Sequence, residues 1–325
     1  MLELALIGAG SMGANHGRVA MGLRDAVVTW IIDPDETRGK RLAEAVGARF
    51  GRYPEMAAGV DAAIIAAPTH THRQLATDFL EAGCHVLVEK PIAPNIEEAE
   101  QMIAAAERCQ RLMMVGHIER FNPAVLELHR LIDQPVHVTA ERVSPYTARI
   151  EEGVTSDLMI HDLDLISFIA GNPIRDVSAI RQDVHGEDDL AMALMTFESG
   201  MTASALASRI GQDKVRRITI TQADEVVRLD LIRQAITIHR VGQIEPTEDG
   251  GGYRQSGLVE VPFLRHRGEP LLLELGHFID SIIQGRQPRV TGQDGLRAIR
   301  LVEMVKRAAN SPAHWASGEP VVSRW

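Results

Sequence analysis

The 325-residue sequence has few of the residues on which several classes of protein depend. Its two cysteines, Cys84 and Cys109, form no Cys-x-x-Cys pair, which favours reduced thiols over a disulfide or zinc framework. Aromatic residues make up only 4% of the chain, which argues against stacking platforms for single-stranded nucleic acid. Lysine and arginine total 34 against 44 aspartates and glutamates, and the net charge of −10 argues against general attraction to nucleic acid or anionic membranes.

Long apolar runs are also missing. No uncharged apolar run approaches the ~20 residues that span a bilayer, and the N-terminus lacks the basic region and cleavage site of a secretory signal. We therefore expect a cytoplasmic protein with no membrane or nucleic-acid partner. With 45% hydrophobic residues, the chain is long enough for two domains, each with its own core.

Residues 1–120 alternate short apolar segments with helical ones, which predicts a Rossmann-type, doubly wound parallel sheet of the α/β class. We expect this N-terminal domain to bind a dinucleotide. The expected strands are 2–7, 26–32, 61–66, 85–88 and 112–115, and the expected helices lie near 35–47, 70–82 and 95–109.

Residues 121–325 have a different rhythm, which predicts an α+β domain with a mainly antiparallel sheet. The small residues of 201–208 indicate either a flat sheet face that packs on a copy of itself or a thin edge strand. The polar stretch Glu245 to Gly257 is expected to be a mobile loop. The expected helices lie near 123–131, 157–170, 269–284 and 293–309, and the clearest strands are 136–143, 190–197, 201–207 and 217–221.

The first chemical motif is Gly8-Ala9-Gly10-Ser11-Met12-Gly13, which follows a strand and opens a helix. Gly8 permits a tight turn, Gly10 lets the backbone approach a pyrophosphate, and Gly13 permits close packing of helix on strand. Ser11 and Met12 then lie at the helix N-terminus, which faces the phosphates. This context favours a dinucleotide site over a chance glycine-rich turn.

Asp33 ends the second strand, 20 residues after Gly13, where a carboxylate can accept hydrogen bonds from an adenosine ribose. A 2′-phosphate there would meet a like charge, so NAD is favoured over NADP. Arg38 and Lys40 could relax that preference, and Asp33 could instead be a turn residue before Pro34.

The next two strands end in candidate site residues, because the carboxyl edge of such a sheet is where ligands bind. Pro68, Thr69 and His72 follow one strand and are candidates to contact the cofactor or substrate, although Thr69 could cap a helix and His72 could be structural. Glu89 and Lys90 end the other. The Lys90 ammonium can donate to a hydroxyl that becomes a carbonyl, or it can be a solvated group paired with Glu89.

The glycine-rich start, Glu89-Lys90-Pro91 and the later Asp157-x-x-x-His161 together resemble the Gfo/Idh/MocA oxidoreductase family. The resemblance covers essentially the whole chain and implies a Rossmann domain followed by an α/β domain with a large open sheet, through which a homodimer or homotetramer assembles. It also implies oxidation of carbohydrate-like secondary alcohols with NAD, with Lys90, Asp157 and His161 at the catalytic positions. Glu89, next to Lys90, is a further candidate to contact the cofactor.

Spacing supports the second motif independently, because Asp157 and His161 are four residues apart and share one helix face. His161, with a reference pKa of ~6.5, can accept the hydroxyl proton, while Asp157 orients the imidazole or holds a neighbouring hydroxyl. Asp164 would extend the set to i, i+4, i+7 and permit a metal reading, but hydride chemistry requires none. Asp162 faces away and is expected to be a second-layer or solvated charge.

Residues 116–123 and 157–164 are most similar to the sugar-nucleotide branch of this family, the UDP-N-acetylglucosamine 3-dehydrogenases. Gly153-Val154-Thr155-Ser156 replaces the family's usual glycine-rich run before the aspartate, which fits that branch. A diphosphate substrate calls for cationic and polar donors, and the candidates are Arg120, Asn122, Arg142 and Arg149, each arginine being equally compatible with a surface ion pair. A myo-inositol or free-sugar dehydrogenase and a non-catalytic dinucleotide sensor remain alternatives.

Overall fold

The computed structural model describes residues 1–146, 153–246 and 253–311. Contacts divide the chain into two compact units. The first contains Met1–Ile132, Arg233–Ile236 and Val261–Arg300. The second contains the described residues of Asp133–Ile232 and Thr237–Glu260 and those from Leu301 to Ser311. Each unit is described by itself below.

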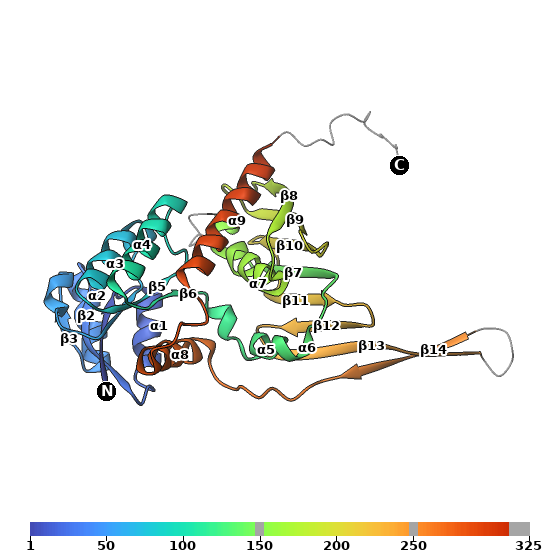
Figure 1. Cartoon of the computed structure of the whole chain (residues 1–325). Helices are drawn as coiled ribbons and strands as arrows, with labels where there is room; N and C mark the ends of the chain where they lie inside the picture. Colours follow the sequence, from blue (N-terminus) through green and yellow to red (C-terminus); the bar gives the residue numbers. More distant parts are fainter. Residues whose placement is uncertain (147–152, 247–252, 312–325) are drawn as a thin grey trace. The chain divides into compact units, whose positions relative to one another are not determined.

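The first unit is built on a six-stranded parallel sheet in the order β3-β2-β1-β4-β5-β6. Its strands β2, β3, β5 and β6 are labelled in Figure 1. The order reverses between β1 and β4, as in a doubly wound sheet, and confirms the predicted Rossmann architecture. The strands are β1 (Leu2–Ile7), β2 (Ala26–Ile32), β3 (Arg49–Gly51), β4 (Ala62–Ile65), β5 (His85–Glu89) and β6 (Met113–Gly116). The helices are α1 (Ser11–Ala20), α2 (Glu36–Val46), α3 (His72–Glu81), α4 (Ile96–Cys109), α5 (Pro123–Leu126), α6 (Leu128–Leu131) and α8 (Pro270–Gln284), with α9 (Gly292–Asn310) near the end of the described chain. Short 3₁₀ turns are η1 (Pro54–Ala57), η2 (Thr69–Thr71) and η3 (Ile118–Phe121).

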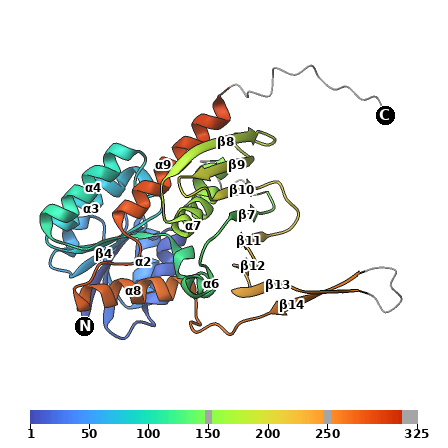
Figure 2. The same ribbon diagram turned by 45° about the vertical axis from the view of Figure 1, so that its right-hand side comes forward.

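The central strands of this sheet are buried on both faces, which explains their continuous apolar runs. Leu4, Ile64 and Leu87 are fully buried in three neighbouring strands. Helices α3 and α4 pack side by side (Figures 1 and 2). The three-residue strand β3 did not stand out in the sequence, because so short a segment carries no alternating pattern.

The predicted continuous helix over 123–131 is wrong. Two short helices, α5 and α6, meet at Glu127, whose carboxylate is buried. This carboxylate accepts the backbone N–H of Arg265 at 2.6 Å and pairs with Arg130 at 2.6 Å. A bond from a segment more than a hundred residues away thus accompanies the break, and periodicity within the helix could not show it.

The second unit holds an eight-stranded sheet in the order β14-β13-β12-β11-β7-β10-β9-β8. Strands β7 and β10 are parallel neighbours, and the pairs β8–β9, β9–β10, β7–β11, β11–β12 and β13–β14 are antiparallel, which confirms a mainly antiparallel sheet. Its strands are β7 (His137–Val143), β8 (Ile174–Gln182), β9 (Leu190–Phe197), β10 (Thr202–Ser208), β11 (Val215–Thr221), β12 (Glu225–Asp230), β13 (Ala235–Pro246) and β14 (Tyr253–Glu260). The π-helical turn η4 (Thr155–Met159) continues into α7 (Ile160–Ala170).

Two expectations for this unit are corrected. Strand β10 lies between β7 and β9, so the thin edge strand is excluded. Its alanines Ala203 and Ala205 are buried, and α7 contacts β10 and β7, so small residues let the helix approach the sheet. The expected loop over 245–257 is strand at both ends, because β13 reaches Pro246 and β14 starts at Tyr253, while 247–252 lie outside the described residues.

The alternating strands leave apolar side chains on one face of the sheet. In β9, Ala193 and Met195 are buried while Met192 and Leu194 are exposed. Ile180 of β8 pairs in register with Met192 and is exposed as well. Within the described residues, Cys84 and Cys109 are both free thiols, and no helix has the length and apolarity needed to cross a membrane.

Candidate active site

The glycine-rich turn lies at the carboxyl end of β1, beside the loop that follows β4. Gly8 has φ +96°, and a Cβ there would collide with the carbonyl of Ala66. A Cβ on Gly13 would collide with the carbonyl of Gly8, so the fold itself requires both glycines. Gly10 differs, because a Cβ there would meet nothing within 4 Å. The space above Gly10 is therefore open to a ligand.

Helix α1 starts at Ser11 in a form suited to an anion. No side chain caps it, and its first turn contains no acidic residue. Helix N-termini with these properties favour negatively charged groups, since their N–H groups and dipole point outward. The cradle above Gly10 and the uncapped helix fit the pyrophosphate of a dinucleotide.

Asp33 follows β2 and is held by several donors. Its carboxylate accepts the backbone N–H groups of Ala9 at 2.6 Å and Asp35 at 2.8 Å, and it pairs with Arg38 at 2.9 Å. Burial alone would raise the pKa of Asp33, but these hydrogen bonds and the guanidinium lower it, so the group stays ionised. Lys40 instead pairs with Glu36 at 2.6 Å. Asp33 thus organises the turn as well as placing a negative charge at the end of β2.

The loop after β4 brings Pro68, Thr69 and His72 to the same edge of the sheet. His72 is buried, and its ring nitrogens lie 3.0 Å from the carbonyl oxygen of Pro91 and 2.9 Å from that of Ala67. Burial lowers the pKa of His72, so the ring is neutral and donates to one carbonyl at a time. His72 therefore links the loops after β4 and β5. Thr69 does not cap a helix, because η2 and α3 have no side-chain cap.

Glu89 lies at the end of β5 inside the unit. Its carboxylate contacts His16 Nε2 at 2.7 Å and accepts the backbone N–H of Lys90 at 3.2 Å. Burial would raise the pKa of Glu89, but the bond to His16 and the charge of Lys90 lower it. A Cβ on Gly116 would lie 3.2 Å from this carboxylate, so the neighbouring strand leaves room for it. Glu89 thus fixes the backbone on which half-buried Lys90 stands.

Glu274 of α8 joins this group and did not stand out in the sequence. One ligand atom each from His16, Glu89 and Glu274 lies within 4.8 Å of the others, and all three residues are buried. Among the described residues, these three side chains are close enough together to hold a metal ion. The available signal was an acidic residue on the apolar stripe of a helix, since Glu274 lies between buried Leu271 and Phe278.

Asp157 and His161 lie on the helical segment of the second unit. Asp157 belongs to the π turn η4 and His161 to the first turn of α7, so the expected ideal α-helical spacing is interrupted. Both are half-buried, whereas Leu158 to Ile160 and Asp162 to Ser167 are buried. The segment thus exposes these two polar side chains from an otherwise covered helix. Single-turn π segments occur often at functional sites.

The neighbouring charges of α7 correct one expectation. Asp162 is not solvated, because it is 2% exposed and pairs with equally buried Arg142 through bonds of 2.8 and 2.9 Å. The guanidinium of Arg142, a candidate to bind a substrate diphosphate, is therefore paired with Asp162. Asp164 is also buried, and the Asp157, His161 and Asp164 triplet does not gather ligand atoms among the described residues.

The remaining candidates to bind the substrate are Arg120, Asn122 and Arg149. Arg120 is buried and lies 3.6 Å from Asp294. Asn122 is buried and caps α5 by accepting the N–H of Ala124 at 3.1 Å. Arg149 lies outside the described residues.

Comparisons with known proteins decide the family. A protein-family model for an oxidoreductase family with an NAD-binding Rossmann fold matches residues 2–117, and its companion for the C-terminal alpha/beta domain matches residues 144–316. The chain belongs to the Gfo/Idh/MocA family. It is an NAD-binding oxidoreductase, a dehydrogenase that acts on CH–OH groups.

Among the relatives, UDP-N-acetylglucosamine 3-dehydrogenase of Acidithiobacillus ferrooxidans is 31% identical, over 95% of this chain and 98% of that protein. A solved structure of that enzyme has a TM-score of 0.86, with 29% identity over 94% of this chain and 97% of the other. The NAD⁺-dependent scyllo-inositol 2-dehydrogenase of Bacillus subtilis is 26% identical over 90% of each chain. Myo-inositol 2-dehydrogenase of Thermotoga maritima is 24% identical, over 94% of this chain and 96% of that protein.

Proposed function

We propose that this oxidoreductase uses NAD to oxidise a secondary hydroxyl of a pyranose, specifically the 3-hydroxyl of a UDP-N-acetylhexosamine. The observation that carries the substrate is the full-length similarity to the Acidithiobacillus ferrooxidans enzyme in both sequence and fold. The product would be a 3-keto sugar. The hydride acceptor for the sugar carbon would be supplied by bound NAD, and the handling of the hydroxyl proton is assigned to side chains of this protein.

Lys90 is proposed to donate a hydrogen bond to the reacting oxygen. Its backbone N–H is held by Glu89, and the loop that follows it is linked to the β4 loop by His72. An ammonium at this point stabilises negative charge on the oxygen as the hydroxyl loses its proton. Removing the proton is assigned to His161, because a neutral imidazole is a base near neutral pH.

Asp157 is proposed to orient the His161 imidazole or hold an adjacent sugar hydroxyl. It precedes His161 by four residues, and both side chains leave the same buried helical segment. Arg120, Asn122 and Arg149 stay proposed substrate contacts. Arg120 lies next to Asp294, and Asn122 caps the start of α5. We therefore expect both side chains to contact the substrate from fixed positions.

The cofactor proposal is NAD rather than NADP. Gly8, Gly10, Ser11, Met12 and Gly13 would hold the pyrophosphate, and Asp33 would face the adenosine ribose. The ionised Asp33 opposes a 2′-phosphate, although Arg38 beside it reduces that opposition. Pro68, Thr69, His72 and Glu89 complete the proposed cofactor side, with His72 and Glu89 acting through the loops they hold.

We further propose residues 1–120 as the NAD-binding domain and 121–325 as the substrate-binding and oligomerisation domain of a cytoplasmic homodimer or homotetramer. The exposed Ile180, Met192 and Leu194 support association through the open sheet, because a soluble monomer rarely leaves such side chains together in water.

A substrate panel tests the proposal. The purified protein is incubated with NAD and, separately, UDP-N-acetylglucosamine, UDP-N-acetylgalactosamine, myo-inositol, scyllo-inositol and free pyranoses, and NADH formation is followed by absorbance. We expect kcat/KM for a UDP-sugar to exceed that for any inositol or free sugar by about tenfold or more. A preference for an inositol would establish the alternative dehydrogenase, and NAD binding without turnover on the whole panel would favour a sensor.

A further inference from the structure

The loop between β8 and β9 forms hydrogen bonds with the start of the helical segment that carries Asp157 and His161. Asp188 Oδ2 accepts the backbone N–H of Thr155 at 2.9 Å, and Asp188 Oδ1 accepts the Thr155 hydroxyl at 3.1 Å. The carbonyl oxygen of Asp188 also accepts the N–H of Val154 at 2.8 Å. Two bonds from Asp188 therefore hold Thr155, the first residue of η4, and a third holds Val154 just before it.

The contact between Asp188 and Thr155 is buried, and the neighbouring backbone leaves little space around it. Asp188 and Thr155 are 6% and 3% exposed. A Cβ on Gly153, which has φ +79°, would lie 2.7 Å from the Asp188 side chain, so only glycine lets the chain pass this carboxylate. Asp188 itself has φ 59°, a conformation that aspartate tolerates better than most residues. Gly153 and Asp188, the residues that meet at this contact, thus both have positive φ angles.

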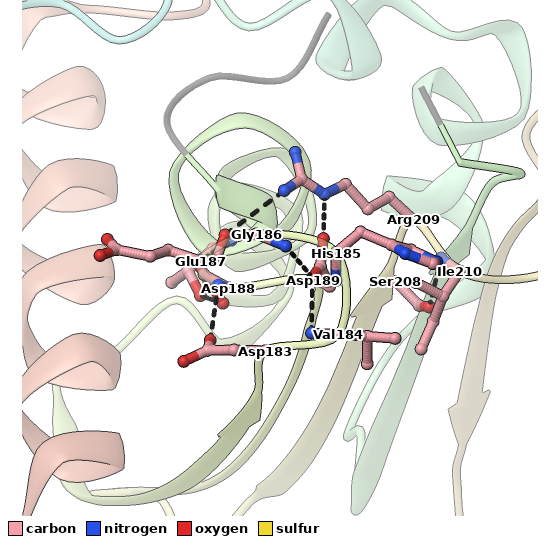
Figure 3. Close-up of polar contacts among 11 residues, drawn as sticks. Asp183, Val184, His185, Gly186, Glu187, Asp188, Asp189, Ser208, Arg209 and Ile210 are labelled. Carbon is pink, nitrogen blue, oxygen red and sulfur yellow. Dashed lines mark hydrogen bonds and ion pairs between the residues drawn. The ribbon is translucent and has the colours of Figure 1, made fainter. Parts of the chain in front are cut away.

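Asp189 forms hydrogen bonds with the backbone of its own loop (Figure 3). Its Oδ2 accepts the N–H groups of Val184 at 2.7 Å, His185 at 2.7 Å and Gly186 at 3.0 Å, while Oδ1 pairs with buried Arg209. Burial would raise the pKa of Asp189, but these four donors lower it strongly.

The backbone N–H of Asp188 adds a bond to Asp183 Oδ1 at 2.7 Å. The loop therefore has hydrogen bonds of its own besides those to Thr155, and the oxygens of Asp188 and Asp189 accept hydrogen bonds from within the chain.

We propose that Asp188 is a positioning residue, whose carboxylate sets the register of η4 so that Asp157 and His161 are presented together. The inference rests on the proposed function, in which these two side chains contact the sugar. Thr155 lies two residues before Asp157 and six before His161, so a shift of the first turn moves both. Displacements of about 1 Å at reacting groups can cost on the order of 10²-fold in rate.

The experiment compares Asp188→Ala, Asp188→Asn and Thr155→Val in the full-length protein with the best substrate of the panel. Asp188→Ala is expected to lower kcat by about 10- to 100-fold while the KM for NAD changes by less than about twofold, because the glycine-rich turn belongs to the other unit. Asp188→Asn keeps one acceptor oxygen and should recover part of kcat. Thr155→Val removes only the hydroxyl bond and should fall between wild type and Asp188→Ala.

Two controls separate positioning from general destabilisation. Glu187→Ala alters the exposed neighbour of Asp188 and should leave kcat unchanged. Ile218→Val weakens the buried core of the same sheet without touching Thr155, and it should lower thermal stability but not kcat of the folded protein. Hydrogen exchange supplies a readout independent of activity, with the amides of 155–161 expected to exchange faster in Asp188→Ala and not in Ile218→Val.

An Asp188→Ala protein with wild-type kcat and wild-type exchange would overturn the positioning role and leave the proposed function intact. So would a loss of kcat no larger than that of Ile218→Val. Failure of the wild-type protein to oxidise any compound of the panel would instead reject the proposed function, and the positioning role with it.

Discussion

Glu274 lies buried beside Glu89 and His16, and neither of its carboxylate oxygens has a hydrogen-bond partner in the described part of the chain. Burial, followed by the negative charge of Glu89, raises the pKa of Glu274 well above its usual value of 4.5. The group is therefore protonated over a pH range in which an exposed glutamate is ionised. An ionised form without donors would carry a large desolvation cost.

This relationship predicts how stability depends on pH. Because the pKa of Glu274 is higher in the folded than in the unfolded protein, its penalty is absent below about pH 4.5 and grows as the pH rises toward the folded value. Glu274→Gln removes this titration. We expect the variant to gain about 1–3 kcal/mol relative to wild type between about pH 5 and pH 8.

Urea denaturation of both proteins at several pH values measures the difference. Glu97→Gln, which alters an exposed glutamate of α4 in the same unit, serves as the control and should track wild type. Parallel stability curves for wild type and Glu274→Gln would show that Glu274 is ionised in the folded protein.

The role of Lys90 leads to a second prediction. Lys90→Met keeps the length of the side chain and removes the ammonium, so turnover should fall by about 10²-fold or more while NAD still binds. Steady-state kinetics and NAD titration by fluorescence measure the two effects. The matched control is Lys40→Met, because Lys40 is an exposed lysine of the same unit paired with Glu36. Near-normal turnover of Lys90→Met would remove Lys90 from the chemistry.

Asp33 and Arg38 together predict the choice of cofactor. Asp33→Ser removes the negative charge and frees the Arg38 guanidinium, which can then pair with a 2′-phosphate. We expect the ratio of kcat/KM for NADP to that for NAD to rise by about 10- to 100-fold. Asp35→Asn, which retains an oxygen to cap α2, is the control. An unchanged ratio would mean that Asp33 only organises the turn.

Much of the fold could be predicted because the relevant signals are local. The strands β1, β2 and β9 begin and end where their apolar runs predict, and Gly8 and Gly13 are required by contacts within one turn. The site was harder to predict where it depends on contacts between residues that are far apart in the sequence. His16 and Glu89 are 73 residues apart, and Arg142 and Asp162 pair across 20 residues between a strand and a helix.

The π turn at Asp157 was also beyond sequence reasoning, because a single inserted residue leaves the apolar pattern of a helix almost unchanged. His72 shows the same limit from another side. Its place after β4 suggested a ligand contact, but its bonds to Ala67 and Pro91 depend on where the β5 loop lies. A residue type at a sheet edge therefore predicts proximity to a site better than it predicts a role.

The exposed apolar face of the second unit predicts association. Leu194 is 55% exposed in the middle of β9, with Met192 and Ile180 exposed nearby. If copies pack through this face, Leu194→Glu places a charge in an apolar interface and should weaken assembly by at least about 2 kcal/mol.

Size-exclusion chromatography with light scattering compares the masses of wild type, Leu194→Glu and Met21→Glu at several concentrations. Met21→Glu is the control, because Met21 is also an exposed apolar residue but lies in the first unit. We expect dimer or tetramer for wild type and Met21→Glu and a smaller species for Leu194→Glu. A wild-type monomer, or an unchanged mass for Leu194→Glu, would show that copies do not associate through this face.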